Sequence, residues 1–199
     1  MTLIIGLTGG IASGKSTISN YLRSLSLPII DADVEARLAV EKGEAGYSKI
    51  VEHFGTEILL EDGSLNRAKL GEIVFRDEKQ RAVLNGIVHP EVRNRMNKKQ
   101  NEAIAEGHMT VILDIPLLFE NKLDSTVDKT ILVYVDTETQ ISRLIDRNKL
   151  SFEQAKLRIE AQMPLQEKKA LADRIIDNNG TVENSQDQAL KILQDWKVL

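Results

Sequence analysis

The sequence predicts an α/β fold in which a parallel sheet carries a phosphate-binding loop, and three neighbouring stretches predict it. Residues 3–7, Leu-Ile-Ile-Gly-Leu, form a short apolar run that suits a buried parallel strand. Residues 9–17 follow and fill the G-x-x-x-x-G-K-[ST] pattern of a phosphate-binding loop. Ile18, Leu22 and Leu25 then fall at helical spacing. Strand, glycine loop and helix thus occur in the order of a P-loop NTPase fold.

Further apolar runs predict the other strands of a five-stranded parallel sheet flanked by helices. Apolar strands that alternate with helices are typical of parallel sheets covered on both faces. These strands and a closing amphipathic helix are expected over residues 27–31, 110–114, 129–135, 174–177 and 182–196. The gap between the second and third strands is too long for one crossover helix, so residues 33–107 are interpreted as an inserted helical region. Turn signals divide that region at residues 42–43, 54–55 and 61–64.

Composition narrows the class of function. The chain has 199 residues, which suits one α/β domain, and no cysteine, which excludes disulfides and thiolate metal sites and fits the cytoplasm. A net charge of −4 argues against a nucleic-acid partner. No apolar stretch approaches the roughly 20 residues of a membrane helix, and the apolar start lacks the basic segment of a signal peptide. We therefore expect a cytoplasmic protein with no nucleic-acid or membrane partner.

The loop residues predict a site for the phosphates of ATP. Glycines let the backbone turn tightly and bring its N–H groups to phosphate oxygens, and a helix N-terminus adds a positive dipole end. Lys15 can reach the β- and γ-phosphates, and Ser16 can ligate Mg²⁺. The nucleotide site is expected to include Gly10, Ile11, Ala12, Ser13, Gly14, Lys15, Ser16 and Thr17.

Two aspartates follow the second expected strand, which should lie near the first. Functional residues of open α/β sheets lie at the carboxyl ends of strands, so Asp31 and Asp33 should approach the phosphate loop. A phosphoryl acceptor hydroxyl needs a group that takes its proton, and Asp33 is the candidate. The alternative is that an aspartate here caps a helix starting near Val34.

Asp114 ends the third expected strand. An aspartate at such a strand end often lies near the Mg²⁺ of a phosphate-loop protein. It would equally suit the cap of a following helix with Pro116 in its first turn. Both interpretations stay open.

Arg143 and Arg147 lie four residues apart, on one face of the helix expected after the fourth strand, and Arg158 comes further on. Guanidinium groups bind the negative charge that gathers during phosphoryl transfer, and a mobile segment carrying them can close over ATP. A solvated helix face is the alternative. His89 precedes Pro90, which favours a bend there, and the pattern leaves the role of His89 undecided.

With these features, the chain resembles the dephospho-CoA kinase family, essentially end to end. The matching segments are residues 6–11, Asp31-Ala32-Asp33 with Arg37, 62–65 with Arg67, Val74-Phe75, His89-Pro90, 116–120, Arg143-Leu144 with Arg147, Arg158-Ile159, Gln162, Lys168, Ala172-Asp173, and Asn178 with Gly180. Many kinases share the phosphate loop, whereas the ordered set is specific. Ala12 stands where the family often has glycine, and we expect little effect because the neighbouring glycines remain.

The resemblance implies phosphorylation of the ribose 3′-hydroxyl of dephospho-CoA, giving CoA and ADP in the final step of coenzyme A biosynthesis, with ATP and Mg²⁺ as cofactors. It implies a sheet with the first strand central. It also implies a core of about residues 1–32, 108–137 and 171–199, a helical region for the CoA substrate at about 33–107, and a lid at about 138–170. We expect a monomer, and the sequence leaves an oligomer open.

Individual roles follow from the same resemblance. Asp33 would be the base, Lys15 and Ser16 would serve ATP and Mg²⁺, and Arg143 and Arg147 would contact the nucleotide from the lid. A metal site is expected at Ser16 and Asp114. The acceptor site is expected to include Thr8, Asp31, Asp33, Arg67, His89 and Leu117.

Two other interpretations were weighed. Another small-molecule kinase, such as a nucleoside monophosphate kinase, fits the phosphate loop but not the segment at 116–120. A nucleotide-dependent switch would explain the N-K-x-D match at residues 121–124. However, Pro116 separates that match from its strand, and the D-x-x-G element, which should come before it, occurs at 177–180 instead. A switch without an acceptor is therefore disfavoured.

Overall fold

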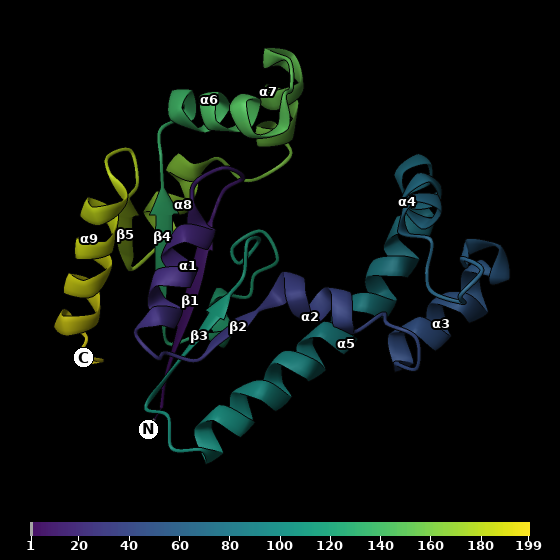
Figure 1. Cartoon of the computed structure of the whole chain (residues 1–199), viewed down its shortest axis with the longest axis horizontal. Coiled ribbons are helices and arrows are strands. Elements are labelled where there is room, and N and C mark those ends of the chain that lie inside the picture. The colour runs from purple at the N-terminus through teal and green to yellow at the C-terminus, as the bar shows by residue number, and fades with distance from the viewer. Residues whose placement is uncertain (1) are drawn as a thin grey trace. The chain divides into compact units, whose positions relative to one another are not determined.

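The computed structural model describes residues 2–199 and contains a five-stranded parallel sheet with the strand order β2-β3-β1-β4-β5 (Figure 1). The strands are β1 (Leu3–Gly9), β2 (Ile29–Asp31), β3 (Thr110–Asp114), β4 (Lys129–Tyr134) and β5 (Arg174–Asp177). The central strand β1 pairs in parallel with both β3 and β4, and β4 pairs in parallel with β5. The expected parallel sheet with a central first strand is confirmed.

The chain divides into two compact units. The first comprises Met1–Ile30 with Ala103–Leu199, and the second comprises Asp31–Glu102. The first unit contains the sheet and the helices α1 (Lys15–Ser24), η2 (Asp124–Thr126), α6 (Thr137–Asn148), α7 (Phe152–Glu160), α8 (Leu165–Leu171) and α9 (Val182–Asp195).

Helices cover both faces of the sheet because alternate strand residues point to opposite sides. On one face, Ile131 and Val133 of β4 join the apolar core with Leu22 of α1 and Leu193 of α9. On the other face, Leu132 packs with Leu165 of α8. The two covered faces explain why these strands read as continuous apolar runs in the sequence.

The α6–α8 segment (137–171) is held by local caps and by packing. Asp136 caps α6 by accepting a hydrogen bond from the Thr139 N–H at 2.7 Å, which lowers the pKa of Asp136 below its ordinary value. Ser151 and Gln154 form a reciprocal capping box at the start of α7. Helix α6 buries Leu144 completely. The two caps define where α6 and α7 begin.

The second unit is helical and has a core of its own. Its helices are α2 (Ala32–Leu38), α3 (Ala45–Phe54), η1 (Thr56–Ile58), α4 (Arg67–Arg76) and α5 (Glu78–Ala105), whose last turn belongs to the first unit. The core cluster consists of Val40, Ile50, Ile58, Leu65 and Leu70. The helix boundaries agree with the turn signals expected in this part of the sequence.

A buried carboxylate ties two helices of this unit together. Glu35 of α2 is 1% exposed and forms ion pairs with Arg95 and Lys99 of α5. Arg95 also pairs with Glu44 at 3.1 Å. Because the buried negative charge has two cationic partners one helical turn apart, its cost of desolvation is offset.

Two local arrangements add detail to what the sequence predicts. Strand β3 lies between β1 and β2, so β2 is the second neighbour of β1 in the sheet. Pro28 gives a reason, because a residue without an N–H suits the edge of a sheet, and its carbonyl accepts the Ile112 N–H at 2.9 Å. His89 and Pro90 lie inside helix α5, which continues on both sides of the proline, and the bend expected there stays a prediction. The carbonyl that meets the proline ring belongs to Gly86, where no side chain adds to the crowding.

Among residues 2–199, no helix combines the length and the apolar character that a membrane crossing requires.

Replacement of Leu22 by alanine tests the contribution of the core between the sheet and α1. Leu22 is fully buried, so Leu22→Ala should lower the free energy of unfolding by about 2–5 kcal/mol through lost burial and a cavity. Denaturant unfolding measures this. Asn20→Ala, at an exposed position of the same helix, should change stability by less than about 0.5 kcal/mol. Equal losses in the two variants would contradict this account of the core.

Candidate functional site

The phosphate loop joins the end of β1 to the start of α1. Gly14 precedes α1 with φ of 85°, and Ala12 lies in the left-handed region with φ of 60°. A side chain at position 14 would also collide with the amide of Asn178, so glycine is required there by space as well as by conformation. The loop places the N-terminus of α1 at the carboxyl end of the central strand, where backbone N–H groups and the helix dipole favour an anion.

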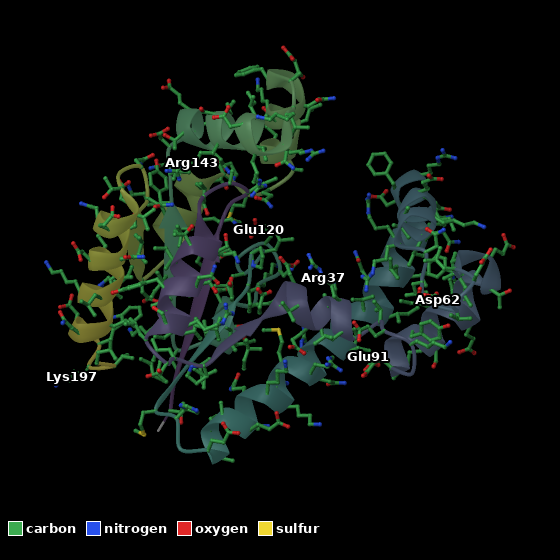
Figure 2. The ribbon with its side chains drawn as sticks, viewed as in Figure 1. Arg37, Asp62, Glu91, Glu120, Arg143 and Lys197 are labelled. Carbon is green, nitrogen blue, oxygen red and sulfur yellow. The ribbon has the colours of Figure 1, made fainter. Side chains whose placement is uncertain are left out.

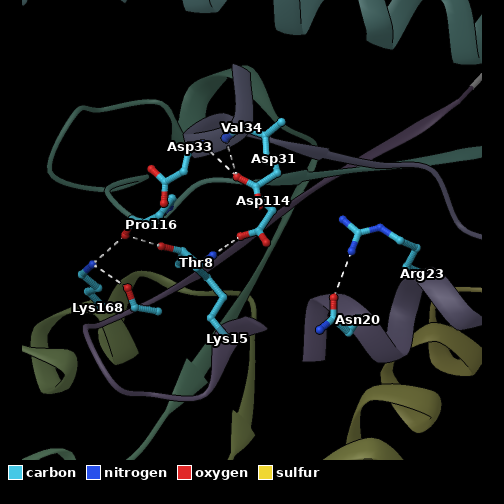
Figure 3. Close-up of polar contacts among 11 residues, drawn as sticks. Thr8, Lys15, Asn20, Arg23, Asp31, Asp33, Val34, Asp114, Pro116 and Lys168 are labelled. Atoms are coloured by element: carbon cyan, nitrogen blue, oxygen red, sulfur yellow. Dashed lines mark hydrogen bonds and ion pairs between the residues drawn. The ribbon is translucent and has the colours of Figure 1, made fainter. Parts of the chain in front are cut away.

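Lys15, the first residue of α1, forms an ion pair with Asp114 at the end of β3 (Figure 3). Asp114 is 1% exposed and is paired in register with Leu7 of β1. No helix follows β3 directly in the described chain, because residues 115–123 form turns before η2. The alternative that Asp114 caps a helix is therefore wrong, and its carboxylate is held at the phosphate loop.

The donor set at this edge fits Mg²⁺ brought in with a nucleotide. Within residues 2–199 no group of three or more acidic or histidine side chains could hold a metal alone. Mg²⁺ in phosphate-transferring sites commonly takes one or two protein oxygens and completes its shell with phosphates and water. The hydroxyl of Ser16 and the carboxylate of Asp114 are oxygen donors of that kind at the loop.

Asn178, which follows β5, connects the loop with Arg143 of α6. The side-chain amide of Asn178 donates to the Ser13 carbonyl at 2.7 Å, and the main-chain carbonyl of Asn178 accepts from Arg143 Nη2 at 2.9 Å. Arg143 is thereby held beside the phosphate loop, and its side chain is labelled in Figure 2. Arg147 is exposed and contacts Asn148 at 2.9 Å. Neither arginine forms an ion pair within residues 2–199. The exposed Arg147 is compatible with the alternative of a solvated helix face, whereas Arg143 is half-buried against the segment after β5.

Asp31 and Asp33 lie at the start of α2 in the helical unit. The Asp31 carboxylate accepts hydrogen bonds from the Asp33 and Val34 N–H groups at 2.8 and 3.1 Å (Figure 3). The helix thus begins at Ala32 and its cap is Asp31. Capping therefore accounts for Asp31, and the exposed carboxylate of Asp33 in the first turn is not used as the cap.

The other residues expected at an acceptor site lie in both units. In the first unit, Thr8 donates to the Pro116 carbonyl at 3.0 Å, and Leu117 is 37% exposed. In the helical unit, Arg67 donates to the Arg37 carbonyl at 3.2 Å and lines a cavity of about 400 Å³. Its other lining residues are Val40, Glu41, Lys42, Ser64 and Leu65. His89 is an exposed residue of α5.

Lys168 is a buried cation at the base of the loop. Sequence reasoning noted it only as a match to the family pattern and predicted no role for it. Its ammonium group is fully buried and reaches three acceptors: the carbonyls of Gly9 and Pro116 at 3.3 and 3.1 Å, and Glu120 at 2.7 Å. The Thr8 hydroxyl donates to the same Pro116 carbonyl (Figure 3). Lys168 therefore joins α8 to the loop and to the segment after β3.

Comparison with known proteins agrees with this geometry. The family model for dephospho-CoA kinase matches residues 3–184. The chain belongs to the dephospho-CoA kinase family. It is 54% identical over 199 residues to the dephospho-CoA kinase of Bacillus thuringiensis subsp. konkukian, and this match covers 100% of both chains.

Two crystal structures are similar over nearly the whole chain. The TT1252 protein from Thermus thermophilus has a TM-score of 0.85 at 33% identity and covers 98% of this chain and 97% of that one. Dephospho-CoA kinase from Campylobacter jejuni has a TM-score of 0.75 at 29% identity and covers 98% of each chain. The similarity to these structures therefore extends over the segments that form the sheet, the loop and the helical unit.

The Lys168–Glu120 pair can be tested by its effect on stability. Glu120→Gln removes the counter-charge of a fully buried ammonium, so the free energy of unfolding should fall by about 3 kcal/mol. Thermal or denaturant unfolding measures the loss. The matched control is Glu160→Gln, which affects an exposed pair with Lys156 at 3.7 Å and should cost less than about 0.5 kcal/mol. A loss below 1 kcal/mol in Glu120→Gln would contradict the importance of the buried pair.

Proposed function

We propose that the chain transfers the γ-phosphoryl group of ATP to the ribose 3′-hydroxyl of dephospho-CoA, giving CoA and ADP. The observation that carries this proposal is a phosphate loop whose lysine is paired with a strand-terminal aspartate, in a chain that belongs to the dephospho-CoA kinase family over its length. Phosphoryl transfer asks little covalent chemistry of the protein. Placement of the reactants and neutralisation of charge supply the rate.

The nucleotide side of the reaction would use the loop and the cations beside it. Backbone N–H groups of the loop at residues 10–17 would bind the phosphates, except that of Ile11, which donates to Gln162 Oε1. Lys15 would neutralise charge on the β- and γ-phosphates. Ser16 and Asp114 would hold Mg²⁺, which supplies further charge neutralisation when bound. We propose that Arg143 contacts the nucleotide, and its hydrogen bond to Asn178 beside the loop supports this role. Arg147 would reach the nucleotide from the same helix face.

On the acceptor side, Asp33 would take the proton of the 3′-hydroxyl. Support comes from the role of Asp31 as the helix cap, which leaves the exposed Asp33 carboxylate for another use. The acceptor itself would be bound by residues that include Thr8, Asp31, Arg67, His89 and Leu117. The cavity of the helical unit is lined by two cations, Lys42 and Arg67, against one carboxylate, Glu41, and this balance suits an anionic substrate.

Each segment of the chain has a proposed role in this reaction. Residues of about 33–107 would bind the CoA substrate, those of about 138–170 would act as a lid that excludes water, and the remainder would form the nucleotide-binding core. Exclusion of water matters because ATP beside a base would otherwise be hydrolysed. A cytoplasmic monomer is proposed, with the absence of cysteine in favour of a reducing compartment.

The activity is tested by ADP release from ATP and Mg²⁺ with and without dephospho-CoA, followed by mass spectrometry of the product. Added mass of one phosphate on dephospho-CoA is expected, with no product from AMP or adenosine at equal concentration. Phosphorylation of AMP instead would favour a nucleoside monophosphate kinase. Slow ATP hydrolysis that dephospho-CoA leaves unchanged would favour a switch without an acceptor.

The role of Asp33 is tested by Asp33→Asn. The amide cannot accept the hydroxyl proton, so kcat should fall by at least about 100-fold while ATP binding persists. Asp187→Asn, an exposed change of the same kind on α9, should leave turnover within about twofold of the original. Near-normal turnover of Asp33→Asn would transfer the role to Asp31.

A further inference from the structure

Both backbone groups of Ile11, in the phosphate loop, are hydrogen-bonded to glutamines of the segment that runs from α6 to α8. The Ile11 N–H donates to Gln162 Oε1 at 2.8 Å. The Ile11 carbonyl accepts from Gln140 Nε2 at 2.7 Å. A backbone N–H can only donate and a carbonyl can only accept, so Gln162 must present its oxygen and Gln140 its nitrogen. The two glutamines therefore fix the peptide planes on both sides of one residue.

The residue that follows adopts an unfavourable conformation. Ala12 has φ of 60°, in the left-handed region where the Cβ of an L-residue is crowded by the next carbonyl oxygen. Such a conformation persists where its surroundings over-determine it. The hydrogen bond from Gln140 holds the peptide unit between Ile11 and Ala12, and the bond to Gln162 holds the preceding unit. These contacts stabilise the loop next to Ala12, whose left-handed conformation is unfavourable by itself.

The contact between the loop and the glutamines is close and largely buried. Gln140 is 4% exposed. A Cβ at Gly10 would lie 2.8 Å from Gln140 Nε2 and 3.1 Å from Leu165 Cγ, so the loop backbone packs directly against both side chains. Gln162 is half-buried, so the loss of the Gln140 bond in particular should leave an unsatisfied backbone group in addition to a freer loop.

We propose that Gln140 and Gln162 are positioning residues that hold the phosphate loop, with Ala12 left-handed, in the shape that binds phosphate. They act through Ile11 and need not touch the nucleotide. A loop fixed before binding loses less conformational freedom when phosphate arrives, so its affinity is higher. The inference rests on the proposed function only in that the loop must bind a nucleotide, and it is independent of the acceptor.

The test is one substitution made at both positions. Gln140→Glu replaces the donor to the Ile11 carbonyl by a second acceptor, whereas Gln162→Glu keeps an acceptor for the Ile11 N–H. Both add one negative charge next to the same residue. The dissociation constant of ADP with Mg²⁺, measured by calorimetry, should rise at least tenfold more in Gln140→Glu than in Gln162→Glu. Gln166→Glu adds the same charge at an exposed position of α8 and should change affinity less than twofold.

Equal changes in Gln140→Glu and Gln162→Glu would mean that charge alone is responsible, and the proposal would fall. The folded state of each variant is followed by thermal unfolding. If Gln140→Glu does not fold, Gln140→Ala serves in its place and should weaken ADP binding at least fivefold. Unaltered affinity in that variant would equally overturn the proposal.

A second measurement separates positioning from general stability. In the Gln140→Ala background, Ala12→Gly removes the crowding of the left-handed residue and should restore ADP affinity by about threefold. A role in overall stability alone would give no such recovery. Because ADP affinity does not involve dephospho-CoA, these results stand even if the acceptor differs. A chain that binds ADP normally but leaves dephospho-CoA unchanged would refute the proposed function and not this inference.

Discussion

The buried ammonium group of Lys168 is the interaction on which the arrangement at the sheet's carboxyl edge depends. It binds the carbonyls of Gly9, at the end of β1, and of Pro116, in the turn after β3, and it neutralises Glu120. A buried cation is stable only where such acceptors surround it. Separation of the segments that carry these groups would leave a buried charge without its partner. The start of the phosphate loop, the turn after β3 and helix α8 are therefore fixed as one group.

Around this group, the phosphate loop gains its shape from residues far away in the chain. Gln140 of α6, Gln162 after α7 and Asn178 after β5 each bond to a backbone group of the loop. Asn178 is itself fixed by Ser185 of α9, whose hydroxyl donates to its side-chain oxygen at 2.7 Å. The nucleotide-binding motif is thus local in sequence, whereas the forces that hold it are not.

That contrast explains what the sequence could and could not predict. Strand β1, the loop and α1 were predictable because apolar runs, glycines and helical spacing are local signals. Asp114 was found as a strand-terminal acid, but its partner Lys15 emerged only from the register of β1 with β3. Gln140 carries no motif, since its importance comes from the one backbone carbonyl that it meets. Pro90 did not show that one helix of 28 residues runs through it, because that depends on the packing of α5 and not on local preference.

The long separation between the loop and its supports has a consequence for synthesis of the protein. Ser13 and Asn178, which share a hydrogen bond, are 165 positions apart. At a translation rate of about 5–20 residues per second, Asn178 is made roughly 10 to 30 s after the loop. During that interval the nascent chain carries the phosphate-binding motif without its full set of contacts. Nucleotide binding should therefore become strong late in translation, after most of the chain has been made.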